Sequence, residues 1–232
     1  LLVRGGGTTS VTAEELDEEF AFLAASVGVR GRRTSVAASL SCLSFNFDRA
    51  FELFLDMLQN PGFQESKLRL EQDRLVEGMK QRNDHPDSIL RREYSSKMFG
   101  DSYLGRRPVG KDIRSITRDD LQEKYKQIVT PANLILSVSG DFDKTEMFTI
   151  LNGTFGRWEG ESNVQTPPDV LSTYEPGIYY VDQDVPQGGV RIGIRSVKRD
   201  DPDVEAISVM NYILGGGGFS SRITQRVRSD EG

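Results

Sequence analysis

The sequence predicts an α+β protein, because two kinds of apolar pattern alternate along it. Several segments place apolar residues at the three- and four-residue spacing of a helix, whereas others alternate apolar and polar residues with the period of two that is typical of a half-buried strand. The chain has 232 residues, of which 37% are hydrophobic and 28% charged, so it can form a core and is not expected to be disordered. Its length fits one large domain or one and a half smaller ones.

The first elements are a glycine turn, a capped helix and a strand. Gly5-Gly6-Gly7 ends a short apolar start, and Thr12 followed by Glu15 is the pattern of a capping box, which predicts a helix over about 13–25. Strict alternation over 36–42 then predicts a strand whose inward-facing side chains are those of Val36, Ala38, Leu40 and Cys42.

Three helices are expected next. The first spans about 47–58, ends at Asn60-Pro61 and places the core side chains Phe47, Phe51 and Phe54 on one face. A long charged helix follows over about 64–82. The turn Asp84-His85-Pro86-Asp87 breaks this helix, and Ser88 is expected to cap the next one, which runs to Met98.

The second part of the chain repeats this mixture. An ordered loop over 100–111 precedes a helix capped by Thr117, a strand over 134–138 and a helix that begins at Asp143. Three prolines and few apolar residues indicate a linker over 159–176. Beyond it we expect strands at 178–181 and around 190–194, and a helix that begins at Asp201-Pro202. We therefore divide the chain into a first half-domain (1–158), the linker, and the start of a second half-domain (177–232).

Composition excludes several functions. The net charge of −6 (29 − 35) argues against nucleic acid as a partner. No run approaches the roughly 18 apolar residues of a membrane-spanning helix, so neither a membrane span nor an intact signal peptide is expected. Since Cys42 and His85 are the only residues of their types, the chain cannot form an internal disulfide, and a self-contained structural zinc site is not expected.

Glycine-rich and polar motifs carry a more specific signal. Gly216-Gly217-Gly218 and Ser221 repeat Gly5-Gly6-Gly7 and Ser10 at an offset of 211 residues, which suggests two tandem halves that are both incomplete here. Three more motifs, at 103–110, 116–121 and 130–141, read Tyr-Leu-Gly-Arg-Arg-Pro-Val-Gly, Ile-Thr-Arg-Asp-Asp-Leu, and Thr-Pro-Ala-Asn followed by Ser-Gly-Asp. In order and content these motifs resemble the pitrilysin and insulinase family of zinc peptidases, which includes the mitochondrial processing peptidases.

The resemblance implies an architecture and a chemistry. The expected half-domain is a mixed β-sheet with helices packed on one face, and two such halves close around an unfolded peptide. Catalysis in the family uses an inverted motif, His-x-x-Glu-His, with a third zinc ligand from a Glu on a later helix. The motif would fall at or before Leu1, and His85 lies far from that position, so the chain as given contains no catalytic residue and no metal ligand pair.

The third ligand can be examined within the chain. The family's helix carries two glutamates seven residues apart, and Glu71 matches the first, which is not itself a ligand. The ligand position then falls on Gly78, which has no side chain to bind a metal. Glu77 lies next to it but points about 100° away around a helix. We therefore expect a noncatalytic half, with zinc only in a catalytic partner half or partner subunit. Two alternatives remain: a catalytic half whose motif lies upstream of Leu1, with Glu77 replacing the ligand, and a structural scaffold subunit.

The resemblance also points to residues that would contact a peptide. Val27, Gly28, Val29 and Arg30 match the strand whose free edge pairs with substrate, although the family commonly has Asn where Gly28 stands. The alternative is a solvated edge on which Arg30, Arg32 and Arg33 discourage aggregation.

Three other features have both a functional and a purely structural interpretation. The run Gly215, Gly216, Gly217 and Gly218 lacks the Lys-Ser/Thr of a phosphate loop and is expected either to touch passing peptide or simply to end a helix. Arg106 and Arg107 would bind a carboxylate of a substrate or hold their loop through ion pairs. Cys42 is expected to be a core residue rather than a reactive thiol.

Overall fold

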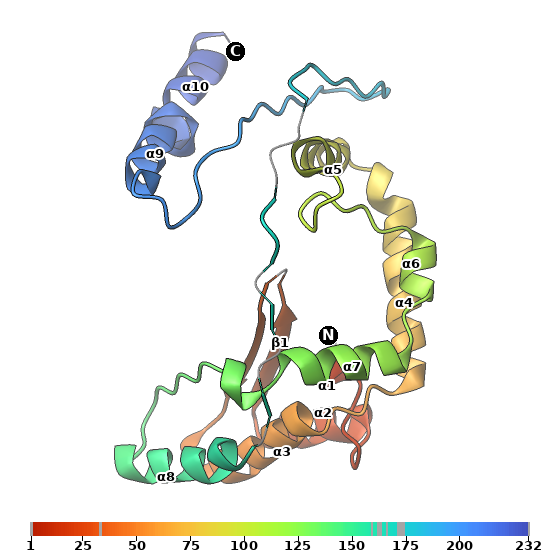
Figure 1. Ribbon diagram of the computed structural model, residues 1–232, viewed down its shortest axis with the longest axis vertical. Helices are drawn as coiled ribbons and strands as arrows, with labels where there is room; N and C mark the ends of the chain where they lie inside the picture. Colours follow the sequence, from red (N-terminus) through yellow and green to blue (C-terminus); the bar gives the residue numbers. More distant parts are fainter. Residues whose placement is uncertain are drawn as a thin grey trace. The chain divides into compact units, whose positions relative to one another are not determined.

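The computed structural model describes residues 2–32, 34–158, 160–161, 164–165, 167–170 and 175–231. By its internal contacts the chain forms two compact units, Leu1–Gly189 and Val190–Gly232. The first unit contains a β-hairpin and most of the helices, and the second contains short helical segments (Figure 1). The α+β class predicted from the sequence is therefore confirmed.

The helices of the first unit largely follow the sequence patterns. They are α1 (Leu2–Gly5), α2 (Ala13–Phe22), α3 (Phe47–Gln59), α4 (Glu65–Lys80), α5 (Pro86–Phe99), α6 (Gly110–Arg114), α7 (Arg118–Ile128) and α8 (Lys144–Thr154). The capping box between Thr12 and Glu15 is present, and Thr117 and Asp120 form a second one at the start of α7. Asp143 accepts two backbone N–H bonds at the start of α8. Local hydrogen bonds therefore fix these helix starts.

Two predicted helix boundaries were wrong. Helix α5 begins at Pro86 rather than after Ser88, because proline is favoured at the first helical position and His85 takes the N-cap place. Helix α2 ends at Phe22 instead of continuing to 25, because Ala24 adopts the left-handed conformation (φ 47°) that commonly ends a helix.

The sheet contains two antiparallel strands, β1 (Ser26–Gly31) and β2 (Val36–Ser41). The expected inward face of the second strand is buried only in part: Leu40 and Cys42 are half-buried, whereas Val36 and Ala38 are exposed. Leu40 and Cys42 pack against the core cluster, whereas Val36 and Ala38 do not belong to it, although Ala38 pairs with the buried Val29. In β1, by contrast, Val27 and Val29 are buried.

The further strands expected at 134–138, 178–181 and 190–194 do not form, so the mixed sheet is reduced to the hairpin in the described residues. Most of their apolar side chains are exposed, and Ile135 retains 97% of its accessible surface. A strand is defined by backbone pairing, and these three segments form no ladder with any described residue. The apolar pattern alone therefore did not suffice to predict strands there.

The core of the first unit joins α2, β1 and α3. Leu16 and Phe20 of α2, the two valines of β1, and one face of α3 form one apolar cluster, against which α8 packs its own partly buried side chains. Phe51 and Phe54 belong to this core, and Phe47 stacks on Phe51 with ring centroids 5.0 Å apart, as the sequence predicted. β1 is thus anchored in the core through the side chains of Val27 and Val29.

The glycine turn before α2 is a close backbone crossing. Gly62 donates its N–H to the carbonyl of Gly7 over 2.8 Å, and Thr8 forms a bridge with Pro61. Gly7 has φ 66°, a conformation that favours glycine. The turn therefore ties the start of the chain to the segment that precedes α4.

The second unit contains α9 (Val204–Asn211) and α10 (Arg222–Thr224), separated by tighter and wider helical turns. Asp201-Pro202 lies in the turn before α9, whose N-cap is Asp203, so the helix begins slightly later than expected. Within the described residues, no helix is long and apolar enough to cross a membrane.

Candidate functional site

The hydrogen-bond register shows which backbone groups of β1 face away from β2. The N–H of Arg32 donates to the carbonyl of Ser35 over 2.7 Å, which makes them a hydrogen-bonded pair at the hairpin turn. In an antiparallel pair such residues alternate with pairs that direct their N–H and C=O groups outward. The register pairs Arg30 with Ala37 and Gly28 with Ser39, so the outward groups belong to Val27, Val29 and Gly31. None of these outward groups bonds to another backbone group of the described residues.

One outward group is already bound by a side chain. Arg4 of α1 donates from Nη1 to the carbonyl oxygen of Val27 over 3.0 Å, and its Nη2 donates to Asp17 of α2 over 3.0 Å. The sequence analysis missed this contact because it joins residues 23 positions apart that share no motif.

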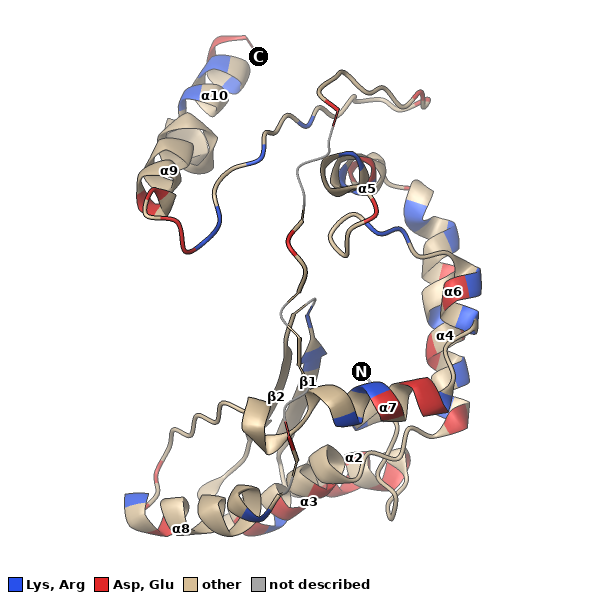
Figure 2. Ribbon diagram, viewed as in Figure 1, with Lys and Arg blue, Asp and Glu red and all other residues tan. Residues whose placement is uncertain are grey.

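Gly28 and Arg30, the other two residues of the predicted edge, are not buried as the two valines are. Gly28 lies in a hydrogen-bonded pair, and a Cβ there would approach Ser39 Oγ to 3.1 Å, so a side chain would have to displace that hydroxyl slightly. Arg30 and Arg32 are exposed near the hairpin turn, where Figure 2 marks basic residues on β1. Arg33 lies outside the described residues.

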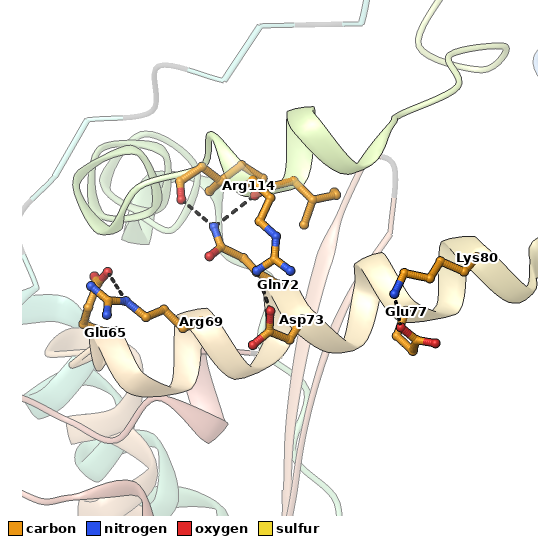
Figure 3. A network of polar contacts seen from close by, with 9 residues as sticks. Glu65, Arg69, Gln72, Asp73, Glu77, Lys80 and Arg114 are labelled. Carbon is orange, nitrogen blue, oxygen red and sulfur yellow. Dashed lines mark hydrogen bonds and ion pairs between the residues drawn. The ribbon is translucent and has the colours of Figure 1, made fainter.

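The helix of the expected metal ligand, α4, carries ion pairs at two of the three positions. Glu71 pairs with Arg74 over 2.9 Å, and Glu77 pairs with Lys80 over 2.7 Å, as Figure 3 shows for the second pair. Gly78 is exposed, and a Cβ built there meets nothing within 4 Å. Local packing therefore does not require glycine at this position.

Helix α4 is held against the following segment by a buried amide. Gln72 donates from Nε2 to the carbonyl oxygens of Ile113 over 3.0 Å and Ile116 over 2.8 Å. Asp73 of α4 and Arg114 of α6 add an ion pair at the surface (Figure 3). These contacts fix the side of α4 that faces α6 and leave Gly78 in solvent.

The residues around α4 do not fit a zinc site. In the part of the chain that the structure describes, no group of three or more His, Cys, Asp or Glu side chains is close enough to hold a metal ion. Glu71 and Glu77 are each bonded to a basic side chain of their own helix, and the exposed His85 lies at the start of α5.

Of the remaining candidates, Arg107 and Cys42 have structural contacts in the described residues. Arg107 donates to Glu93 over 2.7 Å, which ties the loop to α5, and Arg106 is exposed. Cys42 is partly buried against the core, and this burial raises the pKa of its thiol, which disfavours the reactive thiolate.

The run from Gly215 to Gly218 ends the helical segment after α9. The N–H of Gly217 donates to the carbonyl of Tyr212 over 2.8 Å, and Gly218 follows with φ 65°. This left-handed residue stops the helix. Contact of the run with a peptide stays a prediction.

Comparison with known proteins places this geometry in a family. Residues 115–232, half of the chain, match the family described as the peptidase M16 inactive domain. The chain belongs to the peptidase M16 family. The resemblance seen in the sequence motifs to zinc peptidases and processing peptidases is thereby confirmed.

Relatives and solved structures of M16 peptidases agree with this assignment. A probable mitochondrial-processing peptidase subunit beta of Arabidopsis thaliana is 25% identical and aligns with 97% of this chain and 45% of its own length. An uncharacterized zinc protease of Mycobacterium leprae is 27% identical over 82% of this chain and 44% of its own length. The chain thus spans about half the length of these relatives.

The crystal structure of a peptidase M16 inactive domain from Pseudomonas fluorescens superposes with a TM-score of 0.80. It is 20% identical and aligns with 98% of this chain and 56% of its own. A protease from Helicobacter pylori, at 17% identity, gives a TM-score of 0.60 over 74% of this chain and 42% of its own. These likenesses show the fold of an M16 half-domain.

Proposed function

We propose that this M16 chain is a noncatalytic half that binds extended peptide and works with a catalytic partner half, which supplies the zinc. The observation that carries the proposal is Gly78: at the helix position where the resemblance places the metal ligand, the chain has no donor atom, although the space for a side chain is open. Because nothing in the packing excludes Glu there, its absence is best explained by the absence of a metal to bind.

The peptide-binding part of the proposal rests on the outer edge of β1. An edge strand recognises an extended peptide through backbone hydrogen bonds, which tolerate changes of side chain. Gly28 in place of the family's Asn therefore removes a side-chain contact and leaves the outward groups of Val29 and Gly31 in place. In this proposal residues 1–158 form most of one half, 159–176 link it to the next, and the glycine run in 177–232 belongs to the second half.

A pair of proline substitutions tests the edge. Gly31→Pro removes one of the three outward N–H groups of β1 without loss of a bond to β2, and a Cβ at this position meets nothing within 4 Å. In the matched control Ala38→Pro, the N–H removed lies on the outer edge of β2. Binding of a fluorescein-labelled extended peptide, measured by anisotropy, is expected to weaken about two- to tenfold in Gly31→Pro and to stay unchanged in the control.

Three results would overturn the proposal. Equal binding by Gly31→Pro and the unsubstituted chain would show that the β1 edge does not hold the peptide. Stoichiometric zinc in the purified chain, together with cleavage of the peptide seen by mass spectrometry, would show that the chain is catalytic. A chain that never binds peptide would favour the scaffold alternative.

A further inference from the structure

Arg4 occupies the end of the edge that the proposed function assigns to peptide binding. Its guanidinium bridges the outward carbonyl oxygen of Val27 and the carboxylate of Asp17, at 3.0 Å to each. The side chain is partly exposed (44%), and Asp17 lies on a helix whose inner face is in the core. The guanidinium is therefore held from two elements, α2 and β1, while it projects from a third, α1.

Resting on the proposed function, we infer that Arg4 sets the register of a bound peptide by closing the edge at Val27. The outward residues of β1 are Val27, Val29 and Gly31, and each offers one carbonyl to a peptide N–H. A carbonyl oxygen can accept two hydrogen bonds, so the block that we propose is made by the guanidinium group itself, which stands at the outward carbonyl of Val27. A peptide strand that begins beyond this group donates hydrogen bonds only to Val29 and Gly31. Arg4 is thus a positioning residue that fixes where the added strand can start.

The relative strength of the two hydrogen bonds explains why a peptide would not displace Arg4. A bond from a charged guanidinium is roughly twice as strong as one between neutral amides. A peptide N–H that replaced the guanidinium at the Val27 carbonyl would exchange the stronger hydrogen bond for the weaker one. It would also move the Arg4 side chain out of the position in which its hydrogen bond to Asp17 holds it. The peptide therefore binds beyond Arg4 rather than in its place.

An N-methyl scan of the peptide measures this register directly. The probe is a short fluorescein-labelled peptide with one Phe among Thr, Lys and Val residues, so that every position of the peptide is distinguishable. Methylation of a single peptide nitrogen removes one donor, and each donor used is expected to be worth about two- to tenfold in binding. With the full chain we expect two sensitive positions, spaced by two residues. In Arg4→Met a third sensitive position should appear two residues further on, opposite Val27.

Two further variants keep the test interpretable. Asp17→Ala removes the partner that holds Arg4 and should partly open the same third position, so it replaces Arg4→Met if that variant fails to fold. Arg49→Met removes an arginine of similar exposure that pairs with Glu19 of α2 and Glu52 of its own helix, and should leave two sensitive positions.

The outcomes separate the two proposals. Insensitivity to methylation at every position would refute peptide binding by the β1 edge. Three results would overturn the role of Arg4 and leave peptide binding by the edge in place. They are the same sensitive positions in Arg4→Met as in the unsubstituted chain, three sensitive positions already in the unsubstituted chain, and loss of all binding in Arg4→Met when the unsubstituted chain binds.

Discussion

Two glycines of this chain should respond in opposite directions to the same substitution. Gly78 lies inside α4 in solvent, and an added Cβ meets nothing within 4 Å. Gly62 lies where the backbone crosses the glycine turn that precedes α2, and an added Cβ there would be 2.4 Å from the carbonyl oxygen of Thr8. Gly78→Ala therefore tests helix propensity alone, whereas Gly62→Ala tests a backbone contact.

The expected magnitudes follow from these surroundings. Alanine is more favourable than glycine in a helix interior by about 0.8–1.0 kcal/mol, so Gly78→Ala should raise the free energy of unfolding by nearly that amount. In Gly62→Ala the backbone must move and weaken the bond from Gly62 to Gly7, and overpacking of this kind costs about 1–3 kcal/mol. Gly78→Glu should be nearly as stable as Gly78→Ala, because glutamate is also a good helix former.

Urea unfolding followed by circular dichroism measures all three variants. With a slope of about 2 kcal/mol per M, a gain of about 1 kcal/mol moves the midpoint up by about 0.5 M. The reasoning is refuted if Gly78→Ala lowers the midpoint or if Gly62→Ala leaves it unchanged. The first result would mean that glycine at 78 has a structural role, and the argument that its presence reflects the loss of a metal ligand would fail with it.

Further expectations concern the polar contacts of single side chains. Gln72→Leu leaves two backbone carbonyls without the donor of this side chain and should lower the free energy of unfolding by about 1–3 kcal/mol in the same urea assay. As the control, Arg114→Ala removes only an exposed ion pair and should change the free energy of unfolding by less than about 1 kcal/mol. Thr117→Ala removes the cap of α7 and should cost about 1 kcal/mol. The hydroxyl of Thr117 is also the main cause of the lowered pKa of Asp120, so an NMR titration of the Asp120 carboxyl should find a higher pKa in Thr117→Ala. The lowered pKa of Asp120 stabilises the fold at pH values above the ordinary pKa of 3.8, and this stabilisation is lost as the pH falls through the pKa of the folded state. The difference in free energy of unfolding between the unsubstituted chain and Thr117→Ala should therefore shrink in acid. A difference that grows in acid would contradict the role of the Thr117 hydroxyl in lowering the pKa of Asp120.

The helices could be predicted from the sequence because their starts depend on near neighbours. The caps formed by Thr12, Thr117 and Asp143 each join residues no more than three positions apart, and each predicted helix forms. The errors lie where a second local rule competes: proline at the first helical position displaced Ser88 as a cap, and left-handed Ala24 ended α2 early.

The strands and the site depend on contacts that no local pattern contains. Ile135 belongs to an apolar run that was expected to be a strand, yet strand formation requires a neighbouring backbone, and this segment pairs with none of the described residues. The contact between Arg4 and Val27 is of the same kind, since it spans 23 positions and involves a carbonyl that every residue type possesses. Resemblance to a family located β1, but only the register identified which of its groups face outward.

The two proposed properties of this chain depend on different atoms, which explains how one can be kept while the other is lost. In the proposed function a metal ligand needs a side-chain donor, which glycine at 78 lacks, and the open space there means that packing does not depend on the residue at this position. The proposed peptide binding uses backbone groups of the edge strand, so it does not need the Asn that the family commonly has where Gly28 stands, as long as Val27 and Val29 remain anchored in the core. A noncatalytic half can therefore diverge at its metal position without losing the edge that holds the peptide.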